Sequence, residues 1–100
     1  MKMIKYGQQS IDQSDIDSVV DILKSDWLTQ GPTVPKFENL VASKVGAKFG
    51  VASNSATSAL HIAYMSLGLK PGDSVWTSPN TFVATTNAAI FCGAKVDFVD

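Results

Sequence analysis

The sequence lacks the features that mark several large classes of protein. It has one cysteine in 100 residues, Cys92, so no disulfide can form within the chain. This thiol lies in an apolar run and is expected to be buried. No run of eighteen apolar residues is present, so no membrane span is expected, and the start of the chain lacks the apolar core of a signal peptide. These absences favour a cytoplasmic protein.

Excess charge of one sign is also missing. The 8 basic and 9 acidic residues give a formal net charge of -1, which argues against a nucleic-acid-binding surface or a polybasic membrane patch. The single histidine, His61, has no cysteines and carboxylates around it at metal-ligand spacing, so no metal site is predicted. Neither G-x-G-x-x-G nor G-x-x-x-x-G-K-[ST] occurs, so a dinucleotide or P-loop site is not predicted.

The sequence does contain an alternation of short apolar runs and helical patterns. Four helices are expected. The first covers 12–25, the second runs from Pro35 to Val45, the third follows the serine cluster 53–58 and ends at Leu67, and the fourth covers 82–91. Strands are expected at 49–52, 74–77 and 95–99. This alternation predicts an α/β fold with a largely parallel sheet. One hundred residues make at most one small domain, and the chain stops just after an expected strand, so we expect an N-terminal part of a longer protein.

The segment 53–60, Ser-Asn-Ser-Ala-Thr-Ser-Ala-Leu, lies where the expected strand turns into a helix. A helix N-terminus presents unpaired N–H groups that suit an anion. Ser55 and Thr57 could add hydroxyl donors to a phosphate, and Ala56 leaves room for close approach to the backbone. The serines taken alone are more simply interpreted as helix caps, so both interpretations stay open.

Two loops have compositions typical of binding sites. The segment 78–82 follows the second expected strand and brings Phe82 to a helix start, on the side of a parallel sheet where ligands bind. Phe82 could instead be a core residue that faces the sheet. The segment 26–33 contains an aromatic residue, a hydroxyl, an amide and a Gly-Pro break. Trp27 could pack under this loop or bind a ligand, and composition does not decide between the two.

Three motifs, in this order and at this spacing, resemble a known family. They are DWLTQGP at 26–32, NSATSAL at 54–60 and SPNTFVAT at 78–85, and the opening YGQQSI at 6–11 is similar too. The chain resembles the pyridoxal-phosphate (PLP)-dependent sugar aminotransferases of the DegT/DnrJ/EryC1/StrS family over its whole length. Within this family it is most similar to the branch of pseudaminic acid biosynthesis.

The resemblance implies an α/β fold of fold type I, the aspartate-aminotransferase-like architecture. Residues 1–100 would be the N-terminal segment and the start of the large PLP-binding domain. Ala56 and Thr57 would hold the PLP phosphate beside Ser55, and Phe82 would stack on the pyridine ring. Most relatives have Gly at the position of Ala56, and Ala is the next smallest residue. The residues that would line the sugar-nucleotide side are Tyr6, Asp26, Trp27, Leu28 and Thr29.

The implied reaction moves an amino group from L-glutamate to the C4 keto group of a UDP-linked 2-acetamido-2,6-dideoxy-hexos-4-ulose. The resemblance also implies a homodimer. The lysine that would carry the cofactor is expected beyond Asp100, so no catalytic residue is assigned in this chain. Two alternatives are a non-catalytic sensor or regulator whose lysine is replaced, and an α/β fragment without activity. The residue at the lysine position would separate the enzyme from the sensor.

Overall fold

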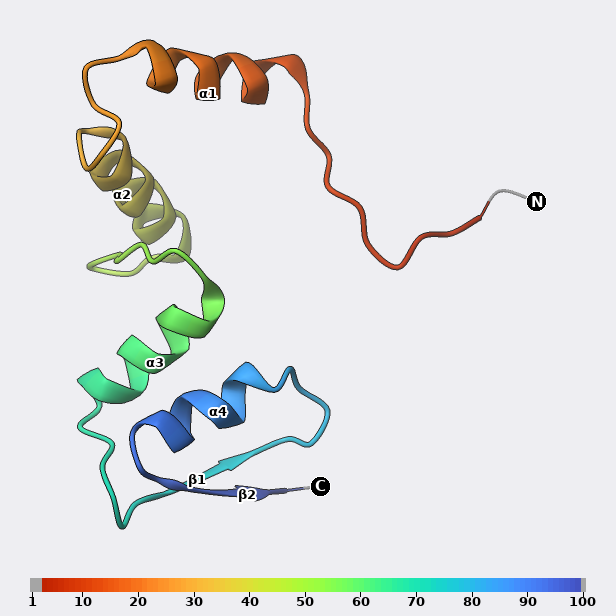
Figure 1. Ribbon diagram of the computed structural model, residues 1–100, viewed down its shortest axis with the longest axis vertical. Coiled ribbons are helices and arrows are strands. Elements are labelled where there is room, and N and C mark those ends of the chain that lie inside the picture. The colour runs from red at the N-terminus through yellow and green to blue at the C-terminus, as the bar shows by residue number, and fades with distance from the viewer. Residues whose placement is uncertain (1–2, 100) are drawn as a thin grey trace. The chain divides into compact units, whose positions relative to one another are not determined.

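The computed structural model describes residues 3–99 and divides into two compact units, Met1–Phe49 and Gly50–Asp100 (Figure 1). The first unit contains the helices α1 (Gln13–Lys24) and α2 (Thr33–Val45). The second contains, in chain order, α3 (Ala56–Ser66), β1 (Ser74–Thr77), α4 (Ala84–Phe91) and β2 (Lys95–Phe98). No helix among the described residues is both long and apolar enough to cross a membrane.

The start of α1 is fixed by a capping box. The Asp12 carboxylate accepts hydrogen bonds from the N–H groups of Ser14 (2.8 Å) and Asp15 (3.2 Å). The Asp15 carboxylate accepts in return from the Asp12 N–H, at 3.0 Å. The Ser14 hydroxyl and these N–H groups hold the pKa of the exposed Asp12 carboxyl below its ordinary value of 3.8, because they stabilise the charged form. The prediction of a helix that begins with this pair is confirmed.

The second helix begins earlier than expected and ends as expected. It starts at Thr33, with Pro35 in its first turn, where a proline is tolerated. Its C-cap, Gly46, has φ 68°, in the left-handed region that glycine adopts without strain. Its large apolar side chains are mostly exposed, with Phe37 at 58% and Leu40 at 61%. Of the residues in α2, only Ala42 is buried.

The second unit is a parallel β–α–β arrangement with an additional helix. The two strands β1 and β2 pair in parallel, with Ser74 opposite Lys95 and Thr77 opposite Phe98. The connecting helix α4 packs on both strands, and α3 packs on α4 (Figure 1). Ala88 and Ala89 are fully buried between these layers. The predicted parallel sheet is therefore confirmed in β1 and β2, and small side chains form its core.

One expected strand is absent. Residues 49–52 form no strand in the structure, and Phe49 and Val51 are 76% and 78% exposed. A strand requires a neighbour to which it can donate and from which it can accept hydrogen bonds. Among residues 3–99, the only sheet is the β1–β2 pair, and those strands bond to each other. The apolar pattern indicated a buried strand, but neither strand of this sheet pairs with residues 49–52.

The remaining differences in the second unit are small. The helix α4 begins at Ala84 rather than at Phe82, and β2 ends at Phe98 although the Val99 N–H still donates to the Thr77 carbonyl at 3.0 Å. Cys92 is half-buried rather than buried. The lone histidine, His61, packs edge-on against Phe91 at a ring-centroid distance of 5.5 Å. His61 is therefore a packing residue between α3 and α4.

Candidate functional site

The N-terminus of α3 is built by serine hydroxyls. Ser55 is the N-cap, with φ -160° and ψ 158°. Its Oγ accepts from the Ser58 N–H at 3.2 Å and donates to the Ser58 Oγ at 3.1 Å. The Ser53 hydroxyl donates to the Ser55 carbonyl at 2.9 Å. The interpretation of Ser55 as a helix cap is therefore confirmed, and its hydroxyl is already used within the helix start.

The cap leaves two backbone donors of α3 without a partner. Ser55 satisfies the N–H of the third helical residue, whereas the N–H groups of Ala56 and Thr57 form no hydrogen bond within residues 3–99. Both residues are exposed. The partial positive charge of the helix N-terminus is concentrated on these groups, so they can bind an anion such as a phosphate. Capping and anion binding are thus compatible at this helix start.

The loop after β1 presents Phe82 to the surface. Phe82 is 75% exposed, so its interpretation as a core residue facing the sheet is wrong for this chain. Two hydrogen bonds hold the loop around Phe82 in a turn. The Thr85 N–H donates to the Phe82 carbonyl at 3.0 Å, and the hydroxyls of Thr81 and Thr85 lie 2.9 Å apart. Phe82 is therefore an exposed aromatic ring on a hydrogen-bonded turn.

Contacts between α3 and α4 tie these two segments into one unit. The Tyr64 hydroxyl donates to the Thr85 carbonyl at 3.4 Å, a long hydrogen bond, and His61 packs on Phe91. The sequence pattern does not reveal the pairing of Tyr64 with Thr85, because a bond between residues 21 positions apart leaves no periodic signal. The spacing of Thr81 and Thr85, four residues apart at a helix start, was the available clue.

A flat, aromatic, phosphorylated molecule such as PLP needs donors for its phosphate and an apolar face for its ring. The second unit offers both, with the N–H groups of Ala56 and Thr57 and the exposed ring of Phe82. A small cavity of about 200 Å³ lies beside the Phe82 loop. Two of its lining residues are threonines, one from the loop and one from α4. The full lining is Pro79, Thr81, Val83, Thr86 and Phe98. The donor set and the ring therefore fit such a group.

The loop between α1 and α2 lies in the first unit and is exposed as expected. Trp27 and Leu28 are 60% and 67% exposed, Asp26 and Thr29 are exposed too, and the side chain of Tyr6 lies fully in solvent. The base of the Trp27 side chain packs against Gly31, while much of the ring is accessible. Trp27 thus packs against the loop through its base, and its role in binding a ligand stays a prediction.

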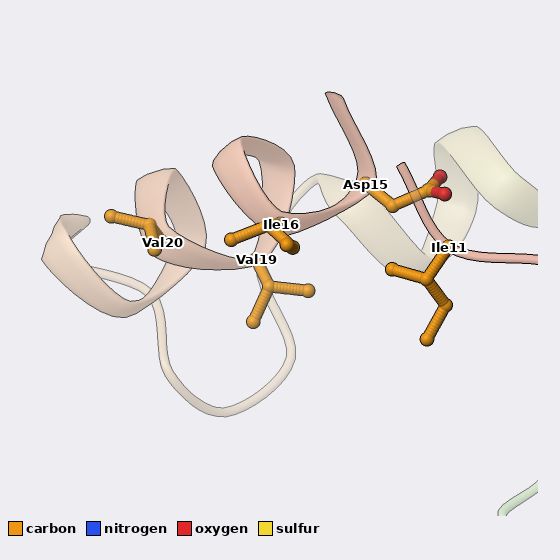
Figure 2. A pocket seen from close by; sticks show the side chains of 5 residues that line it. All are labelled: Ile11, Asp15, Ile16, Val19 and Val20. Carbon is orange, nitrogen blue, oxygen red and sulfur yellow. The ribbon is translucent and has the colours of Figure 1, made fainter. Parts of the chain in front are cut away.

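A further cavity lies along α1 and has little chemistry of its own. Figure 2 shows the side chains of Ile11, Ile16, Val19 and Val20 around it, with the Asp15 carboxylate at one end. Its volume is about 300 Å³. Because Asp15 is already used in the capping box, this apolar cavity is not a candidate catalytic site.

Comparison with known proteins gives a consistent result. Residues 9–100 match the DegT/DnrJ/EryC1/StrS aminotransferase family. The chain is 51% identical over 98 residues to the UDP-4-amino-4,6-dideoxy-N-acetyl-beta-L-altrosamine transaminase of Campylobacter jejuni, and the match covers 98% of this chain and 26% of that protein. It is 44% identical over 97 residues to the spore coat polysaccharide biosynthesis protein SpsC of Bacillus subtilis, covering 97% of this chain and 25% of that one.

Solved structures agree with the sequence matches. The PLP form of the putative sugar aminotransferase Spr1654 from Streptococcus pneumoniae superimposes with a TM-score of 0.91 at 32% identity, over 97% of this chain and 25% of that chain. The Helicobacter pylori aminotransferase PseC, involved in the biosynthesis of pseudoaminic acid, gives a TM-score of 0.90 at 33% identity, over 98% of this chain and 27% of that chain. The chain thus has the α/β fold of PLP-dependent transferases of fold type I and spans about a quarter of the length of its relatives.

Proposed function

The chain belongs to the DegT/DnrJ/EryC1/StrS aminotransferase family, and we propose that the protein it belongs to is a PLP-dependent transaminase that acts on a sugar nucleotide. The observation that carries this proposal is the helix start at Ser55, which leaves the N–H groups of Ala56 and Thr57 available for a phosphate. Residues 1–100 would form the N-terminal segment and the first part of the large, cofactor-binding domain.

The proposed substrates follow from the relatives that match over almost the whole chain. L-glutamate would donate the amino group, and a UDP-linked 2-acetamido-2,6-dideoxy-hexos-4-ulose would receive it at C4, as the name of the Campylobacter jejuni relative suggests. The similarity to Helicobacter pylori PseC, an aminotransferase involved in the biosynthesis of pseudoaminic acid, supports a place in that biosynthesis. We place the reaction in the cytoplasm, and a homodimer is the proposed assembly.

Each residue of the cofactor site has a separate role in this proposal. The N–H groups of Ala56 and Thr57 bind the phosphate, and the Ser55 hydroxyl holds the helix start in the conformation that presents them. The Phe82 ring covers one face of the pyridine and fixes its orientation. When bound, PLP supplies an electron sink for the amino-transfer chemistry. That the phosphate donors and the Phe82 ring line one pocket stays a prediction.

The sugar nucleotide is assigned to the first unit. Tyr6 and the loop residues 26–29 present aromatic, apolar, hydroxyl and carboxylate groups to solvent. Aromatic rings can stack on a uracil base, and hydroxyl groups can bond to the sugar. These roles are proposed for Tyr6, Asp26, Trp27, Leu28 and Thr29.

The test is made with the protein expressed from the complete gene. Incubation with L-glutamate and the 4-keto sugar nucleotide should yield 2-oxoglutarate and the 4-amino sugar nucleotide in equal amounts, measured by mass spectrometry. A sugar nucleotide with a hydroxyl at C4 serves as the control and should yield neither product. A protein that binds PLP but aminates no keto sugar nucleotide would contradict the transaminase and indicate the non-catalytic sensor.

A further inference from the structure

The loop that connects α1 to α2 contains two consecutive residues with positive φ. Gln30 has φ 60° and Gly31 has φ 77° (Figure 1 shows the loop in orange). Among the described residues, Gln30 is the only one other than glycine in this region. The left-handed conformation is costly for a residue with a Cβ atom. The surrounding loop must therefore hold this reversal in place.

Gly31 is required for a second reason besides its φ angle. A Cβ atom built on Gly31 would lie 2.7 Å from the Trp27 Cβ and 3.2 Å from its Cγ. The Cβ is the root of the side chain, so rotation of the indole cannot relieve the collision. Any other residue at position 31 therefore displaces the Trp27 backbone.

Trp27 is held from its other side by the end of α1. Its N–H donates to the Ser25 Oγ at 3.2 Å, and that hydroxyl donates to the Ile22 carbonyl at 2.8 Å. Gly31 in turn precedes Pro32, the N-cap of α2. Trp27 is thus fixed between the two helix ends, although 60% of its surface is exposed.

We propose that Gly31 is a positioning residue of the sugar-nucleotide loop, because its bare Cα is the surface against which the base of Trp27 packs. This contact sets the positions of the Trp27 ring and of the adjoining residues 28–29. The inference rests on the proposed function, in which residues 26–29 contact the sugar nucleotide. Gly31 itself touches no substrate in this account and acts through Trp27.

Other glycines of the chain provide matched controls. Gly46 has φ 68° and Gly68 has φ 76°, and a Cβ at either position would meet nothing within 4 Å. Alanine at 31, 46 or 68 introduces the same backbone strain, but only Gly31→Ala also collides with a side chain. The difference between Gly31→Ala and Gly68→Ala therefore measures the contact with Trp27.

The experiment uses the full-length protein and UDP-N-acetylglucosamine as a probe, with its Kd measured by calorimetry. Gly31→Ala should raise this Kd about tenfold, since a displacement of about 1 Å at a binding group has effects of this order or larger. Gly68→Ala should leave it unchanged. The half-reaction with L-glutamate, followed by the loss of pyridoxal absorbance, should proceed equally in both variants. A purely structural role would slow both half-reactions together.

If Gly31→Ala binds the probe as Gly68→Ala does, the positioning role is overturned while the proposed function stands. If the unmodified protein binds no sugar nucleotide, the proposed function fails, and the inference fails with it. Should Gly31→Ala not fold, it is combined with Trp27→Gly, which removes the colliding Cβ. The double variant should then fold and bind as Trp27→Gly does. The contact with Trp27 is refuted if the double variant stays unfolded while Trp27→Gly and Gly68→Ala, which has the same backbone strain, both fold.

Discussion

Replacing Phe82 by alanine in the full-length protein separates cofactor binding from stability. Phe82 is 75% exposed, so only a quarter of its surface contacts the rest of the chain. Truncating a fully buried Phe costs about 3–5 kcal/mol. By proportion, the contacts that Phe82 makes within these 100 residues should contribute only about 1 kcal/mol to the free energy of unfolding.

The effect on PLP should be larger than the effect on the fold. An aromatic pair contributes about 0.5–1.5 kcal/mol beyond the burial of its area, and a cofactor ring that covers Phe82 would also bury much of its exposed face. The loss of binding free energy should therefore be about 1–3 kcal/mol, which corresponds to a roughly 5- to 150-fold higher Kd. Phe82→Leu should recover the buried area but not the stacking.

The assay is a titration of the apoprotein with PLP, together with a thermal melt of each variant without the cofactor. Phe91→Ala is the matched control, because Phe91 is 60% exposed and is the last residue of α4, the helix that follows the Phe82 loop. It should leave the Kd for PLP unchanged. Equal weakening by both variants would show that damage to α4 is the cause, and an unchanged Kd in Phe82→Ala would refute the stacking role.

Three further predictions concern the helix starts and the chain as a whole. Ala56→Val should weaken PLP binding in an equilibrium titration, because its methyl groups would obstruct the start of α3, whereas Ala63→Val in the same helix should not. The helix signal of the 100-residue chain, measured by circular dichroism, should decrease as the pH falls below 3.8. The charged Asp12 carboxylate stabilises the folded chain fully above its ordinary pKa of 3.8, and this contribution is lost as the pH falls through the lowered pKa of the folded chain. Asp12→Asn should remove that part of the change. The 100-residue chain alone should melt broadly and associate in sedimentation, because the buried hydrophobic residues among those that the structure describes are all alanines. It should also show no transaminase activity. A sharp melt of a monomer would contradict the expected low stability.

Elements defined by local interactions could be predicted from the sequence. The first helix depends on the pair Asp12 and Asp15, three residues apart, and both bonds of the capping box are present. The strand β1 was predicted with its observed bounds, since its limits are a turn at 70–73 and the break after Thr77. In both cases the residues that mark the limits of the element are close to it in the sequence, although the pairing of β1 with β2 is a longer-range contact.

The helix start at Ser55 shows why part of the site could be predicted as well. Capping and phosphate binding looked like competing interpretations of the same serines. The structure separates them by position, because the cap satisfies the N–H of Ser58 and leaves those of Ala56 and Thr57 without partners within residues 3–99. A single cap can satisfy only part of the first turn of a helix. The structure therefore confirms the cap, and phosphate binding at Ala56 and Thr57 stays a prediction that the cap does not exclude.

The features that could not be predicted depend on contacts between residues that no sequence pattern links. The segment 49–52 has the composition of a strand, but strand formation depends on a partner and not on composition alone. Gly31 looked like a simple loop break, since the distance between its Cα and the root of Trp27 depends on the φ values of Gln30 and Gly31 together. Those angles are set by the two helix ends that the loop joins. The position of the Trp27 loop is therefore a property of the α1–α2 connection, and the substitution of Gly31 by alanine is the most direct test of it.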